Sequence, residues 1–158
     1  MAKAAKPVPE GFHTVSPYLA IRDAAKAVEF YKKAFGAQER SLMPRPDGKL
    51  QHAEVQIGDS IIMLSEEFPD MGAPSPQTLN GTTVGIFLYV KDVDAAFQQA
   101  VGAGATVLVP PEDMFWGDRF GTLVDPFGHQ WHIATHQEDL TPEEMGKRAD
   151  EFFKQSKT

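Results

Sequence analysis

Eight short segments of the chain are apolar, or alternate apolar with polar residues, and turn-forming residues bound each of them. Segments of this length and pattern are typical of β-strands. The predicted strands cover 15–21, 38–43, 50–57, 60–65, 84–90, 106–110, 119–124 and 129–135. We therefore expect a protein built largely from β-sheet.

Three other segments repeat apolar residues at the spacing of an amphipathic helix. Asp23 precedes the first, which ends at Gly36, and Asp92 precedes the second, so each aspartate is expected to cap its helix. The third begins with "TPEE", in which Thr141 and Glu144 form a capping box. The expected helices cover 24–36, 93–104 and about 141–156.

The first two helices belong to two copies of one pattern. "YLAIRDAAKAVEFYKKAFGA" begins at Tyr18 and "FLYVKDVDAAFQQAVGAGA" begins at Phe87. Both run from an aromatic-Leu strand through a basic-Asp pair into a helix, and three strands follow. This is an internal repeat of the order strand-helix-strand-strand-strand. Because one such half cannot bury both faces of its sheet, the two sheets are expected to share a surface.

The repeat predicts an α+β fold, with two βαβββ modules whose curved mixed sheets are paired around a cleft, and a C-terminal helix. The first module is expected at 13–66, a linker at 67–83 and the second module at 84–136. Proline and glycine are dense enough in the linker to argue against a regular element, and it could act as a flap over the cleft. The C-terminal helix could pack on its own subunit or on a partner.

Composition excludes several classes of function. The net charge is −7 and the basic residues are scattered, so no basic face for nucleic acid is expected. The absence of cysteine excludes disulfides, thiolate metal sites and a cysteine nucleophile. No apolar run approaches the ~18 residues of a membrane span, and the N-terminus lacks the apolar segment of a signal peptide. We expect a cytoplasmic protein that binds neither nucleic acid nor membranes.

Three motifs give the paired modules a likeness to a known family. They are "HAEVQIGDSIIMLSEEFP", "GTTVGIFLYVKDVDAAF" and "GDRFGTLVDPFGHQWHIATHQEDLTPEE". Over about residues 12–136 the chain resembles the vicinal-oxygen-chelate superfamily, which includes glyoxalase I, bleomycin-resistance proteins and extradiol dioxygenases. The finer motifs resemble its PhnB-like branch. The resemblance implies a homodimer.

Metal-dependent members of that superfamily hold their ion with residues from the first and last strand of each module. The resemblance places these four positions on Ser16, Met63, Gly85 and His132. Neutral serine is a poor ligand, methionine prefers soft ions and glycine has no side chain, so only His132 remains. The resemblance therefore implies that the usual metal site is absent, and no cofactor is expected with certainty; a divalent metal held in another way stays open.

Strand alternation places further polar groups on the inner face. A two-residue turn at 58–59 sets Glu54 opposite Met63, so His52 and Glu54 share the face of Met63. If the halves enclose one space, His132 faces it from the other side. We hypothesise that His52, Glu54 and His132 converge as a catalytic group, with a desolvated Glu54 as general base. The alternatives are a local His52–Glu54 ion pair and a hydrogen-bonded core histidine.

The other histidines near the C-terminus do not extend this group. His129 and His132 leave opposite faces of their strand, and His136 lies about 13 Å from His132 along it. The three histidines are therefore not a zinc motif. A turn contact is expected for His129, and a structural or solvated role for His136.

Aromatic residues complete the candidate ligand site. Alternation points Tyr18, Met63, Phe87 and Tyr89 inward, a lining that suits a flat small molecule but would also serve ordinary packing. Trp116 and Arg119 could form a rim that stacks on the ligand and holds an anion. Otherwise Trp116 is a packed aromatic and Arg119 forms a surface pair with Asp118.

Three functions follow, in order of preference. The first is a small-molecule binding protein that works without metal, for which the acidic charge suits a cationic ligand. The second is a lyase or isomerase that acts through His132 with His52 and Glu54, with or without a divalent ion. The third is a structural or partner-binding dimer module whose groove is filled.

Overall fold

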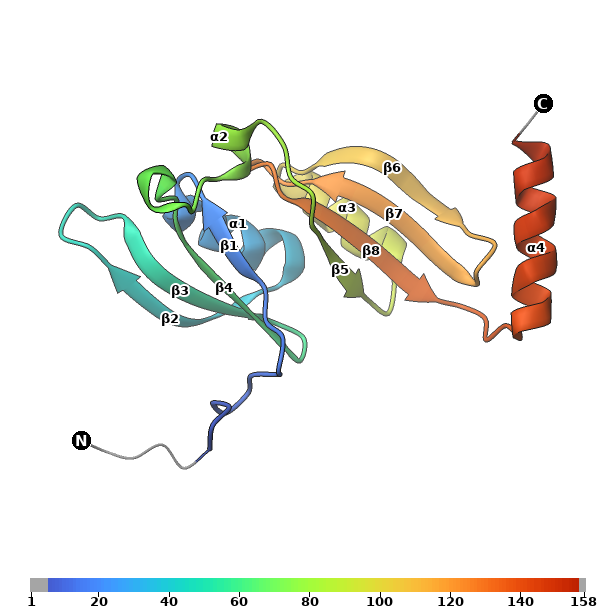
Figure 1. The fold of residues 1–158 in the computed structure, drawn as a ribbon, viewed down its shortest axis with the longest axis horizontal. Helices are drawn as coiled ribbons and strands as arrows, with labels where there is room; N and C mark the ends of the chain where they lie inside the picture. The colour runs from blue at the N-terminus through green and yellow to red at the C-terminus, as the bar shows by residue number, and fades with distance from the viewer. Residues whose placement is uncertain (1–5, 157–158) are drawn as a thin grey trace.

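Two four-stranded mixed sheets stand side by side in the computed structural model, which describes residues 6–156 (Figure 1). The first half contains β1 (Tyr18–Ile21), α1 (Ala24–Phe35), β2 (Gln38–Pro44), β3 (Leu50–Ile57) and β4 (Ser60–Glu66). The second contains β5 (Gly85–Tyr89), α3 (Val93–Ala103), β6 (Thr106–Asp113), β7 (Asp118–Val124) and β8 (Gln130–His136). Between them lie the short helices η1 (Pro69–Met71) and α2 (Pro76–Leu79), and α4 (Pro142–Gln155) follows.

The internal repeat of the sequence corresponds to two halves of the structure with the same strand topology. The strand orders are β1-β4-β3-β2 and β5-β8-β7-β6, so each half places its first strand beside its last. That pair is parallel in both sheets, and the remaining pairs are antiparallel. The two sheets do not join into one, which leaves β1 and β5 as edge strands. The predicted α+β fold of two βαβββ modules with a C-terminal helix is confirmed.

The strand registers confirm the predicted facing of side chains. Gly58 adopts a φ of 58° in the β3–β4 turn, and Ile57 pairs with Ser60, which sets Glu54 opposite Met63. In the second sheet Phe87 lies opposite His132. The residues between these positions are buried under the helices, as the period of two requires.

The helix-covered faces of both sheets share one core. Helices α1 and α3 pack against each other and lie behind the sheets in the view of Figure 1. Phe35 of α1 reaches Trp131 of β8, with ring centroids 4.3 Å apart. The buried Asp125 accepts hydrogen bonds from the Tyr31 hydroxyl at 2.7 Å and from Trp131 Nε1 at 2.9 Å. Burial, and then the charge of Asp125, raise the pKa of Tyr31 well above its usual value.

Two of the three predicted helix caps are confirmed. Asp92 accepts a hydrogen bond from Ala95 N at 3.0 Å, and Thr141 forms its capping box. The cap predicted at Asp23 is wrong, because this residue adopts a left-handed φ of 69° and its side chain caps nothing. The Glu66 carboxylate replaces it and accepts from the backbone N–H groups of Asp23 and Ala24. A carboxylate from β4 therefore accepts hydrogen bonds from the backbone N–H groups at the start of α1.

The linker contains η1 and α2, so the expectation that it holds no regular element is wrong. Glu67 anchors it and accepts hydrogen bonds from Thr78 Oγ1 at 2.7 Å, Ser75 N at 2.8 Å and Arg22 Nε at 2.9 Å. Burial raises the pKa of Glu67, but the bonds from Thr78, Arg22 and Ser75 outweigh it and hold that pKa at about 2. A role as a flap stays a prediction.

Helix α4 stands apart at the end of the second module (Figure 1) and buries none of its residues. Arg148 and Glu138 form two hydrogen bonds at its base, at 2.6 and 3.2 Å. The ring centroid of Phe152 lies 5.3 Å from that of Phe115 in the β6–β7 turn, so the helix contacts its own subunit there. No helix in residues 6–156 is long and apolar enough to cross a membrane. The expectation of no signal peptide rests partly on residues 1–5, which lie outside the described residues.

Candidate functional site

Apart from Arg119, the candidate residues on strands lie on the two sheet faces that the helices leave uncovered, which we term the open faces. The first open face carries Tyr18, His52, Glu54 and Met63, whose positions follow from the pairing of β1 and β3 with β4. The second carries residues of β5, β7 and β8. For the residues to which strand alternation assigned a face, the observed registers agree with that assignment.

A row of hydrogen-bonded side chains crosses the first open face. Tyr18 Oη lies 3.1 Å from His52 Nδ1, and His52 Nε2 lies 3.3 Å from Glu54 Oε1. Arg40 Nε approaches Glu54 Oε2 at 3.9 Å. The side chain of Glu54 remains 21 % exposed. Glu54 thus has a local histidine partner and a cation nearby, as in the predicted alternative of a local ion pair.

A cavity of about 770 Å³ lies at the end of this row formed by Glu54 and Arg40. The N-terminal segment 7–16 forms one side of it, and Arg40, Glu54 and Met63 form the other. Gly11, with a φ of 82°, brings this segment close to the Arg40 guanidinium. The strand pattern identified Glu54 and Met63 but gave no sign that residues before the first strand would cover them.

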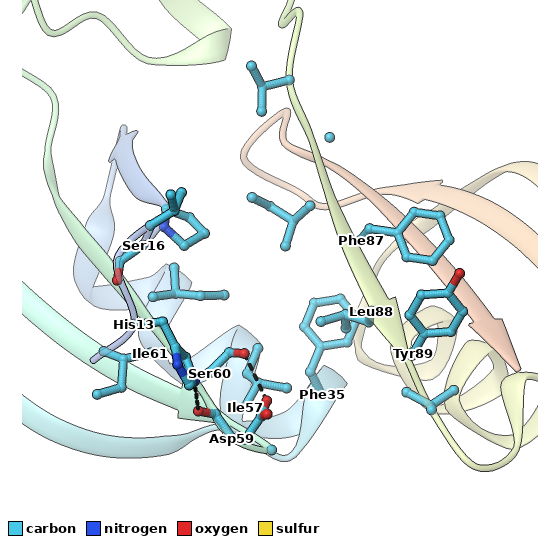
Figure 2. A pocket seen from close by; sticks show the side chains of 18 of the residues that line it. His13, Ser16, Phe35, Ile57, Asp59, Ser60, Ile61, Phe87, Leu88 and Tyr89 are labelled. Carbon is cyan, nitrogen blue, oxygen red and sulfur yellow. Dashed lines mark hydrogen bonds between the residues drawn. The ribbon is translucent and has the colours of Figure 1, made fainter. Parts of the chain in front are cut away.

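A second groove, of about 870 Å³, lies between the two halves (Figure 2). Strand β5 forms one wall, the β3–β4 turn and His13 form the other, and Phe35 lies at the floor. Ser16, Gly85, Phe87 and Tyr89 line it, whereas His52, Glu54 and His132 do not. In Figure 2 the rings of Phe87 and Tyr89 lie on the far side of β5 from Ser16 and Asp59.

Those two rings begin an aromatic surface on the second open face, which we term the aromatic platform. It consists of Phe87, Tyr89, Trp116, Phe120 and His132. Ring centroids are 4.9 Å apart for Phe87 and Tyr89, 5.8 Å for Phe87 and Phe120, and 5.7 Å for Trp116 and Phe120. The imidazole of His132 stacks on Phe120 at 5.7 Å with 16° between the planes. Phe87 is 45 % exposed and Tyr89 66 %, so the platform meets solvent.

Gly85 fixes the place of His132 in the platform. A Cβ atom at position 85 would overlap His132 Nε2, so only glycine leaves room for the imidazole over β5. On its other side, His132 Nδ1 lies 2.9 Å from Thr122 Oγ1. His132 is therefore both half-buried and hydrogen-bonded, and its ring stacks on Phe120.

A buried carboxylate lies beside the platform. Asp118, 3 % exposed, accepts from the Tyr89 hydroxyl at 3.1 Å and from Trp116 Nε1 at 3.2 Å. His136 Nδ1 lies 2.7 Å from its other oxygen, and His136 Nε2 lies 2.9 Å from Asp139. The hydrogen bonds with Asp139 and Asp118 raise the pKa of His136.

Comparison with known proteins decides the family. The model of the Glyoxalase/Bleomycin resistance protein/Dioxygenase superfamily matches residues 11–133. The chain belongs to this superfamily. An uncharacterised protein of Mycobacterium tuberculosis (strain H37Rv) is 47 % identical over 134 residues, which cover 83 % of this chain and 79 % of the relative.

Solved structures of other proteins share the fold. A gene product of Arabidopsis thaliana has a TM-score of 0.64 and 28 % identity, and the match covers 78 % of this chain and 98 % of that one. A PhnB protein of Bacillus cereus has a TM-score of 0.60 over 78 % and 99 % of the two chains. At 16 % identity, the latter likeness concerns the fold alone.

Of the four positions to which the resemblance assigns metal ligands, only His132 carries a good donor for a hard divalent ion. The imidazole of His132 fills the space over Gly85, the position that offers no side chain, and Ser16 and Met63 are poor donors for a hard divalent ion. Within residues 6–156 no three or more histidine, cysteine, aspartate or glutamate side chains gather in a way that could hold a metal ion.

The structure keeps the hypothesised catalytic residues in two groups within one chain. His52 and Glu54 lie on the first sheet and His132 on the second, and within the described part of the chain no hydrogen bond or ion pair joins them. Each group has partners of its own, Tyr18 in one and Thr122 in the other. Their catalytic role therefore stays a prediction.

The remaining predicted residues have defined partners. Arg119 forms a two-point contact with Asp94, at 2.9 and 3.0 Å, and a third hydrogen bond with Asp113. The Arg119–Asp118 pair, one of the two alternatives for Arg119, is wrong. Three hydrogen bonds to carboxylates leave the guanidinium little capacity for a ligand anion. His129 Nε2 lies 3.2 Å from Ala20 O, a contact between the two halves.

Sequence reasoning missed Asp118 as a functional candidate. Its donors come from β5, from the β6–β7 turn and from the end of β8, which are far apart in the sequence. The one available signal was the position of Asp118 between the predicted rim residues Trp116 and Arg119. That signal pointed to Arg119 as the partner, and the fold instead turns Arg119 toward α3.

Proposed function

We propose that this chain is a small-molecule binding protein of the PhnB-like branch, that it works without the superfamily's usual metal ligands, and that its ligand is flat and aromatic. The observation that carries this proposal is the aromatic platform. Soluble proteins rarely expose contiguous apolar surface unless something binds there. Aromatic rings favour flat partners, since stacking adds to the free energy of apolar burial.

The position of the platform supports this proposal. Phe87 and Tyr89 belong both to the platform and to the groove between the halves, so a ligand on the rings can extend over the edge of β5. The groove is of the size that small-molecule sites in proteins have.

A homodimer is part of the proposal. Exposed apolar side chains lie on both open faces: Tyr18 and Met43 on the first, Phe87 and Tyr89 on the second. A second copy packed against these faces would turn the platform of one subunit toward the polar row of the other. The mass of the protein in solution, measured by light scattering across a dilution series, tests this assembly; a monomer at all concentrations contradicts it.

The test of binding uses three two-ring compounds of one shape: 1-methylquinolinium, which is cationic, neutral 1-methylnaphthalene and anionic 1-naphthoate. Calorimetric titration is carried out on the wild type, on Phe87→Ala and on Phe153→Ala. Phe153 is a matched control, because it is an exposed phenylalanine, 58 % accessible, on α4 outside the platform.

We expect at least one compound to bind the wild type and Phe153→Ala equally. Phe87→Ala should bind it about tenfold more weakly, since a lost ring contact removes about 1–2 kcal/mol of burial and stacking. No binding of any of the three compounds, or equal binding by both variants, contradicts the proposal.

A lyase or isomerase is the second candidate, and one observation favours it. His52 lies between the Tyr18 hydroxyl and Glu54, an arrangement that can pass a proton along the first open face. The substitution His52→Ala separates the two functions. It should abolish turnover of a substrate found by activity screening, but leave the affinity for the platform ligand unchanged.

A further inference from the structure

The carboxylate of Asp118 holds two rings of the platform. The Tyr89 hydroxyl and Trp116 Nε1 both donate to the same atom, Asp118 Oδ2. Tyr89 ends β5, whereas Trp116 belongs to the turn before β7. One buried group therefore sets the orientation of rings that come from separate elements.

The negative charge beside these rings is not fully compensated. Arg119, the adjacent residue, is directed toward Asp94 and Asp113. Within residues 6–156 the basic group that pairs with Asp118 is His136, and His136 also faces Asp139. Two carboxylates thus share one imidazole, so the group of Asp118, His136 and Asp139 has a net negative charge whether or not His136 is protonated.

Both features favour a cation on the platform. An aromatic ring attracts a positive charge placed over its face, and a carboxylate beside the ring adds direct attraction. Because Asp118 is 3 % exposed, water screens its charge less than it screens that of Asp139, whose side chain is fully exposed.

We propose that Asp118 is the specificity-determining residue of the aromatic platform: it positions Tyr89 and Trp116 and selects flat ligands that carry a positive charge. This inference rests on the proposed function, and it adds the chemical class of the ligand, a planar aromatic cation. Asp118 acts through the two rings it holds and through its charge.

The experiment compares 1-methylquinolinium with neutral 1-methylnaphthalene in three proteins. Wild type should bind the cation about tenfold more tightly than the neutral compound. Asp118→Asn retains an oxygen that accepts from Tyr89 and Trp116 but removes the charge. The variant should therefore bind the cation about tenfold more weakly than the wild type does, and its affinity for the neutral compound should be unchanged. Asp139→Asn removes an equal charge in full contact with water, so the ratio of the affinities for the cation and the neutral compound should change less than twofold.

The outcomes separate a charge effect from a structural one. If Asp118→Asn loses the same affinity for both compounds, Asp118 has a structural role only and the inference is overturned. The inference is also overturned if Asp139→Asn lowers the affinity for the cation as much as Asp118→Asn does. If Asp118→Asn does not fold, the wild-type comparison decides, because equal affinity for the cation and the neutral compound also overturns it. Failure of all the compounds to bind the wild type contradicts the proposed function itself.

Discussion

Replacing Gly85 by alanine tests the packing that forms the platform. The new methyl group would overlap His132 Nε2, so the imidazole must move. That movement breaks the contact between His132 and Thr122 Oγ1, worth about 1 kcal/mol, and the stacking on Phe120, worth about 1 kcal/mol. The lower chain entropy of alanine returns about 0.5 kcal/mol. Gly85→Ala should therefore lower the free energy of unfolding by about 1–2 kcal/mol.

Gly102 provides a matched control, because a Cβ there meets no atom within 4 Å and the residue lies inside α3. Gly102→Ala should raise the free energy of unfolding by up to about 1 kcal/mol, the difference in helix propensity. Urea denaturation of both variants gives the two values. Opposite signs for the same chemical change would assign the effect at position 85 to the neighbouring side chain.

A double-mutant cycle identifies that neighbour. In the His132→Ala background the overlap is gone, so Gly85→Ala should become neutral or slightly stabilising, which corresponds to a coupling free energy of about 1–2 kcal/mol. If Gly85→Ala costs as much without the imidazole as with it, or costs nothing in the wild type, the reasoning about His132 is refuted.

Three further predictions concern stability. Asp125→Ala leaves the buried Tyr31 hydroxyl and Trp131 N–H without their acceptor and should cost about 3–5 kcal/mol in urea denaturation; a loss under 1 kcal/mol contradicts the role of this network. The pKa of Glu67 is lowered to about 2, so its stabilising contribution of up to about 3 kcal/mol is present above pH 4.5 and lost as the pH falls toward 2. Glu67→Gln should flatten that acid slope, and an unchanged slope would assign it to other carboxylates. Deletion of 141–158 should change the free energy of unfolding by about 1 kcal/mol or less, because α4 buries no residue; a loss of several kcal/mol in denaturation would show that the helix has a partner.

The sequence predicted the elements of the fold because local patterns determine them. The bounds of β3 and the pairing of Glu54 with Met63 follow from strand alternation and a two-residue turn. The cap at Asp23 could not be predicted correctly, since its replacement, Glu66, comes from β4, which neighbours α1 only after folding.

Strand alternation predicted the sheet face of individual site residues, but not the arrangement of the two sheets. Alternation placed Phe87 and His132 on one face, and the register sets them opposite each other. It could not show how the two sheets lie relative to one another, so the convergence of His52 and Glu54 with His132 had no local basis. The role of Asp118 was missed for the same reason, because two of its three donors, Tyr89 and His136, are distant in the chain.

The central claim is that a flat ligand binds on the aromatic platform, and the two tryptophans of the chain allow a direct test. Trp116 belongs to the platform, whereas Trp131 is fully buried in the core, so each indole N–H gives a separate proton–nitrogen correlation signal. On titration with 1-methylquinolinium, the Trp116 signal should shift until the site saturates, and the Trp131 signal should remain in place. Saturable binding that leaves the Trp116 signal unmoved would place the ligand elsewhere and contradict the account.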